Sequence, residues 1–189
     1  MKKKITVYCA SSSNINEIYL ESASKLGEMI ALSGHEVVYG GGKVGLMGKL
    51  ADGALRKGGK VTGIIPDFLM DLELGHSGVS KLIITKDLHE RQRKMMDLAD
   101  SIFVLPGGSG TFVELFEAVT WKRLGRIIIP IIIININNYF DTLIFALNKA
   151  IDEGFMRKEH FELWTVVDDI DSAVRTLHEK NSFVPFDIA

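Results

Sequence analysis

Short apolar runs rich in β-branched residues alternate with helix-like stretches along the whole chain. The first run covers residues 5–10, and the amphipathic stretch after it covers residues 16–33 and ends at Gly34. Strands that alternate with helices build a parallel sheet, and strands that are apolar on both faces belong to a sheet covered on both sides. The pattern therefore predicts an α/β fold with a Rossmann-like, doubly wound parallel sheet and helices on both faces.

The same reasoning places the other elements in a single domain over residues 1–189. No repeat, linker or low-complexity tract interrupts the chain, and its 189 residues fit one α/β domain. In such folds ligands bind outside the carboxyl ends of the strands. Further strands are expected at residues 36–39, 61–65, 81–85, 102–105, 131–134 and 164–167. Further helices are expected at residues 45–57, 88–99 with Asp87 as the cap, 111–124, 141–153 and 169–180.

Charge and hydropathy exclude several classes of partner. A net charge of −2 gives no general attraction to nucleic acid or anionic lipid. The most apolar segment, residues 127–134, is far shorter than the roughly 20 residues that span a bilayer. The apolar run after the N-terminal lysines ends by Ala10 and is too short for a signal peptide. Cys9 is the only cysteine, so we expect no internal disulfide. Together, the charge, the hydropathy and the single cysteine predict a cytoplasmic protein without nucleic-acid or membrane partners.

A glycine-rich loop follows the second expected strand. Its run Gly40-x-Gly42-x-x-Gly45 matches the dinucleotide-binding fingerprint between a strand and a helix. It follows the second strand rather than the first, however, and Asp67, at the distance of a ribose-binding acid, stands directly after Pro66. Two interpretations remain: a dinucleotide cofactor site, or glycines that permit a tight turn and a close approach of the helix to the sheet.

A second glycine-rich loop joins the fifth expected strand to a helix. Its run Pro106-Gly-Gly-Ser-Gly-Thr111 can turn backbone N–H groups towards a ligand, and the dipole of the following helix favours an anion there. Ser109 and Thr111 add hydroxyl donors. No Lys-Ser/Thr pair follows the last glycine, so the loop is not a Walker A loop, which argues against a kinase or an ATPase. The loop indicates either a phosphate site or a plain turn with Thr111 as the helix cap.

The helix after this loop carries two acidic residues in its first two turns. Glu114 and Glu117 are three residues apart, so they are neighbours on a face different from the buried one. They are either ordinary acids at a helix start, or carboxylates about one turn from the phosphate loop that contact a ribose or activate a water. The apolar residues expected on the buried face are Phe112, Leu115, Phe116 and Val119.

Positive charge gathers at the start of the preceding helix, where Arg91, Arg93 and Lys94 follow His89. This cluster is either a solvated charged face or part of an anion site. The five histidines are scattered without paired ligand spacing, so we expect no metal site.

Several linked motifs occur in one order along nearly the whole chain. The run Pro106-Gly-Gly-Ser-Gly-Thr-Phe-Val-Glu114 has the form PGGxGTxxE. The other runs are Cys9-Ala-Ser-Ser12, Tyr39-Gly-Gly-Gly-x-x-Gly-Leu-Met-Gly48, Gly63-Ile-Ile-Pro66, Leu88-His-Glu-Arg91, Leu98-Ala-Asp100, Thr120-Trp121 and Gly154-Phe155. Together they resemble the LONELY GUY (LOG) family of cytokinin riboside 5′-monophosphate phosphoribohydrolases, long mislabelled as lysine decarboxylases.

The resemblance implies a Rossmann-like homodimer that hydrolyses a nucleoside 5′-monophosphate, such as AMP or a cytokinin riboside 5′-monophosphate, to a free base and ribose 5-phosphate. It implies no cofactor and no metal. By position, Arg91 and Glu114 resemble the catalytic pair of the family. The residues that resemble its substrate-binding set are Glu73, Gln92, Gly107, Gly108, Ser109, Gly110, Thr111, Glu117 and Thr120.

Four positions depart from the family pattern. Gln92 stands where the family usually has a lysine, which bears on phosphate binding, and Ser109 replaces a frequent tyrosine in the pocket wall. Ala10 replaces a glycine and Leu88 a methionine. These departures concern the preferred base more than the reaction.

Three other functions stay open at the level of the sequence. A non-catalytic carrier of a nucleotide or phosphorylated cofactor would share the fold, and turnover of AMP distinguishes it from a hydrolase. A PLP-dependent lysine decarboxylase needs a Schiff-base lysine with a partner for the pyridine ring, and the sequence marks neither. An NAD-dependent oxidoreductase rests on the loop at Gly40 alone.

Overall fold

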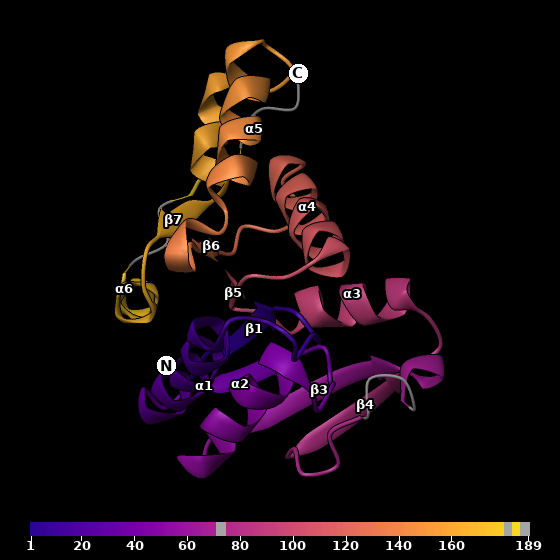
Figure 1. The fold of residues 1–189 in the computed structure, drawn as a ribbon. Coiled ribbons are helices and arrows are strands. Elements are labelled where there is room, and N and C mark those ends of the chain that lie inside the picture. The colour runs from indigo at the N-terminus through magenta and orange to yellow at the C-terminus, as the bar shows by residue number, and fades with distance from the viewer. Residues whose placement is uncertain (71–74, 180–182, 186–189) are drawn as a thin grey trace.

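The computed structural model describes residues 1–70, 75–179 and 183–185, which form an α/β fold around one sheet (Figure 1). Every pair of neighbouring strands in the sheet is parallel. In spatial order the strands are β4 (Lys81–Thr85), β3 (Val61–Pro66), β2 (Glu36–Tyr39), β1 (Lys4–Tyr8), β5 (Ser101–Val104), β6 (Ile131–Ile134) and β7 (Thr165–Val167).

Helices follow these strands along the chain and cover both faces of the sheet, which confirms the predicted doubly wound architecture. None of the described helices is long and apolar enough to cross a bilayer. The α-helices are α1 (Glu17–Leu32), α2 (Gly45–Arg56), α3 (Leu88–Asp97), α4 (Ser109–Arg123), α5 (Asp141–Asp152) and α6 (Ile170–Arg175). The 3-10 turns are η1 (Asp67–Leu69), η2 (Ile136–Asn138), η3 (Lys158–Leu163) and η4 (Thr176–His178).

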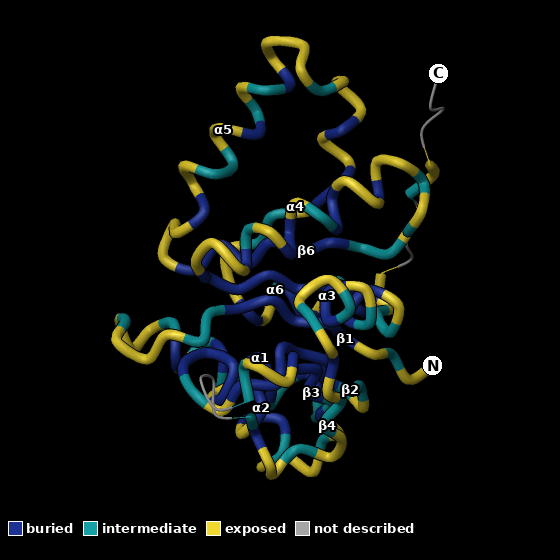
Figure 2. The backbone as a smooth tube through the Cα atoms, turned by 90° about the vertical axis from the view of Figure 1, so that its right-hand side faces the viewer, coloured by how far each residue is buried: buried dark blue, intermediate teal, exposed yellow. Residues whose placement is uncertain are grey.

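The two faces of the sheet carry separate hydrophobic cores. On β1, Ile5 and Val7 point to the face covered by α1, α2 and α6, whereas Tyr8 points to the face covered by α3, α4 and α5. Figure 1 shows α1 and α2 side by side, and Figure 2 shows the buried backbone in dark blue along the central strands. Side chains alternate between faces along a strand, so strands covered on both sides are apolar throughout, as the run of isoleucines in β6 illustrates.

Side-chain caps fix where three of the helices begin. Asn16, Asp87 and Asp169 each accept a hydrogen bond from a backbone N–H in the first turn of α1, α3 and α6. The cap at Asp87 is the one that the sequence predicts. Because Asp87 fixes the start of α3, it also fixes the position of Arg91, which stands about one turn later on the same helix.

The strand order reverses at β1, with β2 to β4 on one side of it and β5 to β7 on the other. The chain leaves β1 towards α1 on one face and leaves the neighbouring β5 towards α4 on the opposite face. The loops after these two strands therefore diverge. Doubly wound sheets bind ligands in the crevice that such diverging loops leave at the carboxyl ends.

The start of α4 differs from the predicted one. The helix begins at Ser109 with Gly108 as the N-cap, so Thr111 is not the helix cap. The first turn of a helix has no intrahelical partners for its N–H groups, so serine and glycine occupy it without loss of helical hydrogen bonds. The backbone N–H groups of Ser109, Gly110 and Thr111 consequently form the open end of the helix.

The buried face of α4 also differs from the predicted one. Leu115 and Val119 are buried as expected, but Phe116 is 42% exposed, and Glu114 and Lys122 are buried. The apolar residues of this helix are spread around its axis, so hydrophobic periodicity alone does not define the face that packs.

The last helix is shorter than the predicted residues 169–180. α6 ends at Arg175 and passes into η4, and residue 180 lies outside the described residues. The Thr176 hydroxyl donates a hydrogen bond to the carbonyl of Ala173 at 2.7 Å. Such bonds from a side chain to the preceding turn compete with continuation of the helix.

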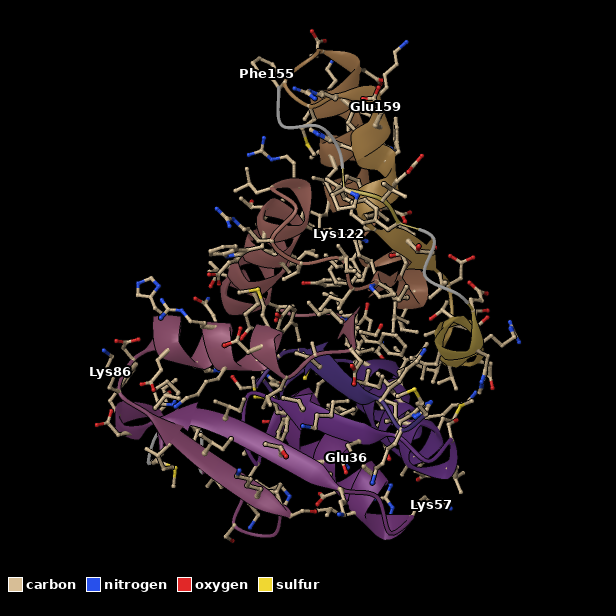
Figure 3. All side chains as sticks on the ribbon, turned by 180° about the vertical axis from the view of Figure 1, so that it is seen from behind. Glu36, Lys57, Lys86, Lys122, Phe155 and Glu159 are labelled. Carbon is tan, nitrogen blue, oxygen red and sulfur yellow. The ribbon has the colours of Figure 1, made fainter. Side chains whose placement is uncertain are left out.

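Lys122 is a buried cation on the side of α4 that faces the C-terminal part of the chain (Figure 3). Its ammonium nitrogen lies 4.3 Å from the centre of the Phe183 ring, in a cation–π contact. Its side chain borders a cavity of about 480 Å³ that also contacts the first residues of β6 and β7, Ile131 and Thr165. Burial lowers the pKa of Lys122 to about 8.

Replacement of Lys122 by methionine should stabilise the protein at neutral pH. Its pKa is about 8 in the folded protein against an ordinary value of 10.5, so folding disfavours the charged form. This penalty is fully present below pH 8 and disappears as the pH rises towards 10.5. One pKa unit corresponds to about 1.4 kcal/mol and the cation–π contact offsets about 1 kcal/mol, so we expect Lys122→Met to raise the free energy of unfolding by roughly 2 kcal/mol at pH 7.

Urea unfolding at pH 7 and pH 10 measures this difference. The matched control is Lys149→Met, which removes an exposed lysine from a surface pair with Glu153 and should change the free energy of unfolding by less than about 0.5 kcal/mol. A gain for Lys122→Met that does not shrink between the two pH values would contradict a penalty caused by the buried ammonium.

Candidate active site

A pocket of about 480 Å³ lies in the crevice at the carboxyl ends of the strands. It is bounded by the loop after β1, the starts of α2 and α4, η1 and one side of α3. Seven of the predicted site residues therefore surround one cavity. Its described lining residues are Cys9, Ala10, Ser11, Ser12, Met47, Leu69, Leu88, Arg91, Gln92, Gly108, Ser109, Gly110, Thr111, Val113 and Glu114.

The start of α4 forms an anion cradle at one side of this pocket. No side chain caps the helix at Gly108, so the N–H groups of its first turn are available to a ligand. A Cβ atom added at Gly108 or Gly110 would meet no atom within 4 Å, which shows that both glycines border open space. Free N–H groups and the positive end of a helix dipole together favour a phosphate or carboxylate.

Two contacts hold the loop before α4 in place. The Tyr139 hydroxyl donates a hydrogen bond to the carbonyl of Gly107 at 2.7 Å. Gly107 also packs on Thr111, because a Cβ at residue 107 would lie 2.1 Å from the Thr111 hydroxyl oxygen. The loop is thus fixed before any ligand binds, which lowers the entropic cost of binding.

The predicted pair Arg91 and Glu114 meets across the pocket wall. Nη2 of Arg91, on α3, lies 3.3 Å from Oε1 of Glu114, on α4. Both residues are buried, at 5% and 6% exposure. Removal of one charge from a buried ion pair is strongly destabilising, because the other charge loses this compensation in a medium of low polarity.

Tyr8 ends β1 on the same face of the sheet as this pair. Burial raises the pKa of Tyr8, and the negative charges of Glu114 and Glu117 raise it further, against the opposing effect of Arg91. The phenol therefore stays protonated.

Glu117 accepts a hydrogen bond at Oε1 from the indole of Trp121 at 3.4 Å, and its Oε2 is buried without a hydrogen-bond partner among the described residues.

Four predicted site residues lie elsewhere. Gly107 borders a neighbouring cavity of about 150 Å³ that shares Gly108 with the main pocket. Glu117 is half-buried and is not among the described lining residues. Thr120 is exposed on the outside of α4. Glu73 lies outside the described residues.

The predicted set of site residues omits several apolar residues that line the pocket, among them Met47, Leu69 and Val113. These three stand three to nine residues beyond the end of a strand, which is the signal in the sequence that could have found them. With Ala10 and Leu88 they give the pocket a largely apolar lining, which suits the flat faces of an aromatic base.

The glycine-rich loop after β2 has another role. None of Gly40, Gly42 and Gly45 is among the described residues that line the pocket. Gly45, with φ of +61°, lies so close to the main chain after β1 that a Cβ there would be 2.4 Å from the carbonyl oxygen of Ser12. This contact supports the interpretation of these glycines as a tight turn with close backbone approach.

In the described part of the chain, no group of three His, Cys, Asp or Glu residues could hold a metal ion.

Comparison with known families and proteins gives consistent matches. The model of a family described as "Possible lysine decarboxylase" matches residues 47–177, more than half of the chain. A cytokinin riboside 5′-monophosphate phosphoribohydrolase of Rhodococcoides fascians is 38% identical over 176 residues, which cover 93% of this chain and 89% of that protein. A protein of the same name from Arabidopsis thaliana is 34% identical over 175 residues, which cover 93% of this chain and 77% of that protein.

Solved structures share the fold at lower identity. A molybdenum cofactor binding protein from the phototrophic bacterium Rippkaea orientalis has a TM-score of 0.73 at 21% identity, covering 94% of this chain and 96% of that chain. The molybdenum cofactor carrier protein of Chlamydomonas reinhardtii has a TM-score of 0.69 at 20% identity, covering 94% of this chain and 97% of that chain. At these identities the likeness concerns the fold alone.

The ion pair should reveal itself in the stability of single and double variants. Arg91→Met leaves the Glu114 carboxylate buried without this partner, and we expect it to lower the free energy of unfolding by about 3 kcal/mol. Adding Glu114→Gln should restore part of that loss, so the double variant should lose less than the sum of the single variants by roughly 1–3 kcal/mol. Urea unfolding at pH 7 measures all four proteins.

The exposed pair of Lys149 and Glu153 offers a matched control cycle. Its coupling should stay below about 0.5 kcal/mol, because solvent screens both charges. Additive effects of Arg91→Met and Glu114→Gln would show that the two side chains are not paired in the folded protein.

Proposed function

The chain belongs to the LONELY GUY (LOG) family, and on that premise we propose that it hydrolyses the N-glycosidic bond of a nucleoside 5′-monophosphate such as AMP. The protein is then a hydrolase whose products are the free base and ribose 5-phosphate. One observation carries this proposal: the Glu114 carboxylate, paired with Arg91, lines the same pocket as an open helix N-terminus.

In the proposed reaction Glu114 acts on the sugar. Cleavage of the bond between C1′ and the base develops positive charge on the ribose, as glycoside hydrolysis does. A carboxylate beside C1′ stabilises that charge and can accept a proton from the attacking water. The water oxygen then bonds to C1′, and the electron pair of the broken bond goes to the base, which takes up a proton from solvent while the carboxylate returns its proton to solvent. We assign this role to Glu114.

Arg91 supports Glu114. Its positive charge compensates the buried carboxylate at 3.3 Å and holds it in one position. Because Arg91 also lines the pocket, it can bind a ribose hydroxyl or the phosphate. The nearby phenol of Tyr8 stays neutral and adds no competing charge.

The 5′-phosphate belongs at the start of α4. The N–H groups and hydroxyls of Ser109, Gly110 and Thr111 would bind it and so fix the position of the ribose against Glu114. Gln92, buried in the pocket wall, supplies a neutral amide, so the charge of the phosphate is met mainly by the helix end. A substrate without the phosphate loses this orientation.

The description of the family as possible lysine decarboxylases does not fit the pocket. A PLP enzyme needs a lysine in the site to form a Schiff base with the cofactor. Among the described residues that line the pocket there is no lysine. Lys122 is buried, but it borders the separate cavity beside the starts of β6 and β7.

A non-catalytic carrier of a phosphorylated ligand is the second candidate. Solved structures with this fold include proteins named for molybdenum cofactor binding and carriage, at 20–21% identity. The relatives named as phosphoribohydrolases are more similar, at 34–38% identity. The hydrolase is therefore better supported, and turnover separates the two candidates.

We also propose that the protein is a homodimer that uses the exposed side of α4. Val113, Phe116, Trp121 and Leu124 on this helix are between 37% and 55% exposed, and a group of exposed apolar side chains supports an interface. Thr120 is exposed on the same helix, outside the pocket of its own chain. A second copy packed there could receive Thr120 at its own pocket, which would account for the substrate-binding role that the family resemblance implies.

A cytoplasmic location completes the proposal. Cys9 is the only cysteine in the sequence and is buried. Chains that cannot form an internal disulfide are usual in the reducing cytoplasm, which supports this location.

Release of a free base tests the proposed reaction. Protein incubated with AMP should release adenine, detected by chromatography, whereas adenosine should yield none because it lacks the phosphate. Glu114→Gln should lower kcat by about 10²–10⁴-fold, since it removes the carboxylate that carries charge and proton. The matched control is Glu153→Gln on the exposed side of α5, which should keep the kcat of the unmodified protein. Measurable binding of nucleoside monophosphates without release of any base would favour the carrier.

The oligomeric state tests the proposed interface. We expect Phe116→Glu to convert a dimer into a monomer, measured by light scattering during gel filtration, because a carboxylate would be buried at the contact. Phe145→Glu is the control, since Phe145 is 70% exposed and belongs to α5 rather than to α4. A dimer that survives Phe116→Glu but is lost with Phe145→Glu would move the interface to α5.

A further inference from the structure

Gly40 is the first residue after β2, and it packs directly against Arg91. A Cβ atom added there would lie 2.2 Å from Nη2 of Arg91, 3.0 Å from its Cζ and 2.9 Å from Cε of Met47. Contacts under 3.0 Å to a Cβ do not occur without a shift of one of the atoms. The guanidinium therefore occupies the space that any side chain at residue 40 would need.

The requirement at this position is steric rather than conformational. Gly40 is not among the glycines with positive φ, so the backbone would accept alanine. Gly41 and Gly45, in the same run, do have positive φ, at +82° and +61°. Gly40, Gly41 and Gly45 thus serve different purposes, and among these three only Gly40 packs on the arginine.

The same nitrogen of Arg91 contacts both Gly40 and Glu114. Nη2 lies 3.3 Å from Oε1 of Glu114, and it is the atom nearest to the space beside Gly40. Arg91 is 5% exposed and borders the pocket, so its guanidinium would yield to a side chain at residue 40 by shifting within the site. A methyl group on residue 40 would therefore displace Nη2 relative to the carboxylate.

We propose that Gly40 is a positioning residue of the reaction, because it provides the space in which Arg91 orients Glu114. The inference rests on the proposed hydrolysis for its catalytic readout. It also assigns a purpose to the fingerprint-like run after β2: its first glycine receives a side chain of the protein rather than the phosphates of a dinucleotide.

A shift of Arg91 should affect rate more than substrate binding. The anion cradle is built from residues 108–111 after β5, whereas Gly40 follows β2 and is not among the residues that line the pocket. The phosphate should therefore still bind when Arg91 moves. Misplacement of a catalytic group by about 1 Å can cost about 10²-fold in rate.

The first experiment compares Gly40→Ala with the unmodified protein. We expect kcat for AMP to fall by about 10²-fold and KM to change by less than about 3-fold. The matched control is Gly59→Ala, whose Cβ would lie 2.5 Å from the Cβ of Ala31 and 2.9 Å from the carbonyl oxygen of Ala54, with Arg91 not among its nearest atoms. It should lower the urea midpoint and leave kcat unchanged. A Gly40→Ala protein with the kcat of the unmodified protein would overturn the proposal.

A double-mutant cycle with Arg91→Met tests whether Gly40 acts through the arginine. Methionine ends before the position of Nη2, so alanine at residue 40 would find no guanidinium to displace. Gly40→Ala should then lower kcat and the urea midpoint in the unmodified protein, and change each by much less in the Arg91→Met background. Equal effects in both backgrounds would overturn the proposal.

The urea midpoints separate this proposal from the proposed reaction, because they need no substrate. A protein that does not hydrolyse AMP but shows the stability coupling between residues 40 and 91 would refute the reaction and support the steric role of Gly40. Hydrolysis of AMP without that coupling would support the reaction and overturn the role of Gly40.

Discussion

The buried contact between Arg91 and Glu114 is the interaction on which the site depends. Burial of a single ion costs several kcal/mol, so each of these charges needs the other. They come from α3 and α4, and their attraction therefore also fixes how these helices meet. The surroundings accommodate the pair: Gly40 leaves space for the guanidinium, and Tyr8 next to it stays neutral.

Most elements follow from the sequence because their signals are local. Strands are apolar runs between turns, and Asp87 caps its helix with its own side chain. The start of α4 and the exposure of Phe116 depend on how that helix packs, which local pattern does not encode. Residues 108–111 could be assigned to the site beforehand because parallel strands bring their loops to one edge, whereas it is the family resemblance that groups Arg91 and Gln92 with them. The contact of Gly40 with Arg91 could not, since a glycine has no side chain to indicate its partner.

The fold and the chemistry of this chain are separate properties. Proteins named for cofactor carriage share its backbone arrangement at about one fifth identity. Any doubly wound sheet offers a crevice at its carboxyl edge, so the fold alone does not determine what happens in that crevice. What favours hydrolysis is a carboxylate paired with an arginine inside that crevice. The assignment of function therefore depends on a few side chains rather than on the sheet.

The proposed anion cradle and the Glu114 carboxylate belong to one helix, α4. The number of residues between them therefore sets both their distance along the helix axis and the direction in which the carboxylate points around it. Each residue of a helix adds about 100° of rotation and 1.5 Å of rise. One residue inserted between Thr111 and Glu114 would swing the carboxylate away from α3 while every backbone hydrogen bond of the helix could still form. Such an indel would separate the carboxylate from the helix start that we propose for phosphate and would also remove the stabilisation of the buried pair, so a change from an enzyme to a binding protein by this route would need a compensating change at Arg91.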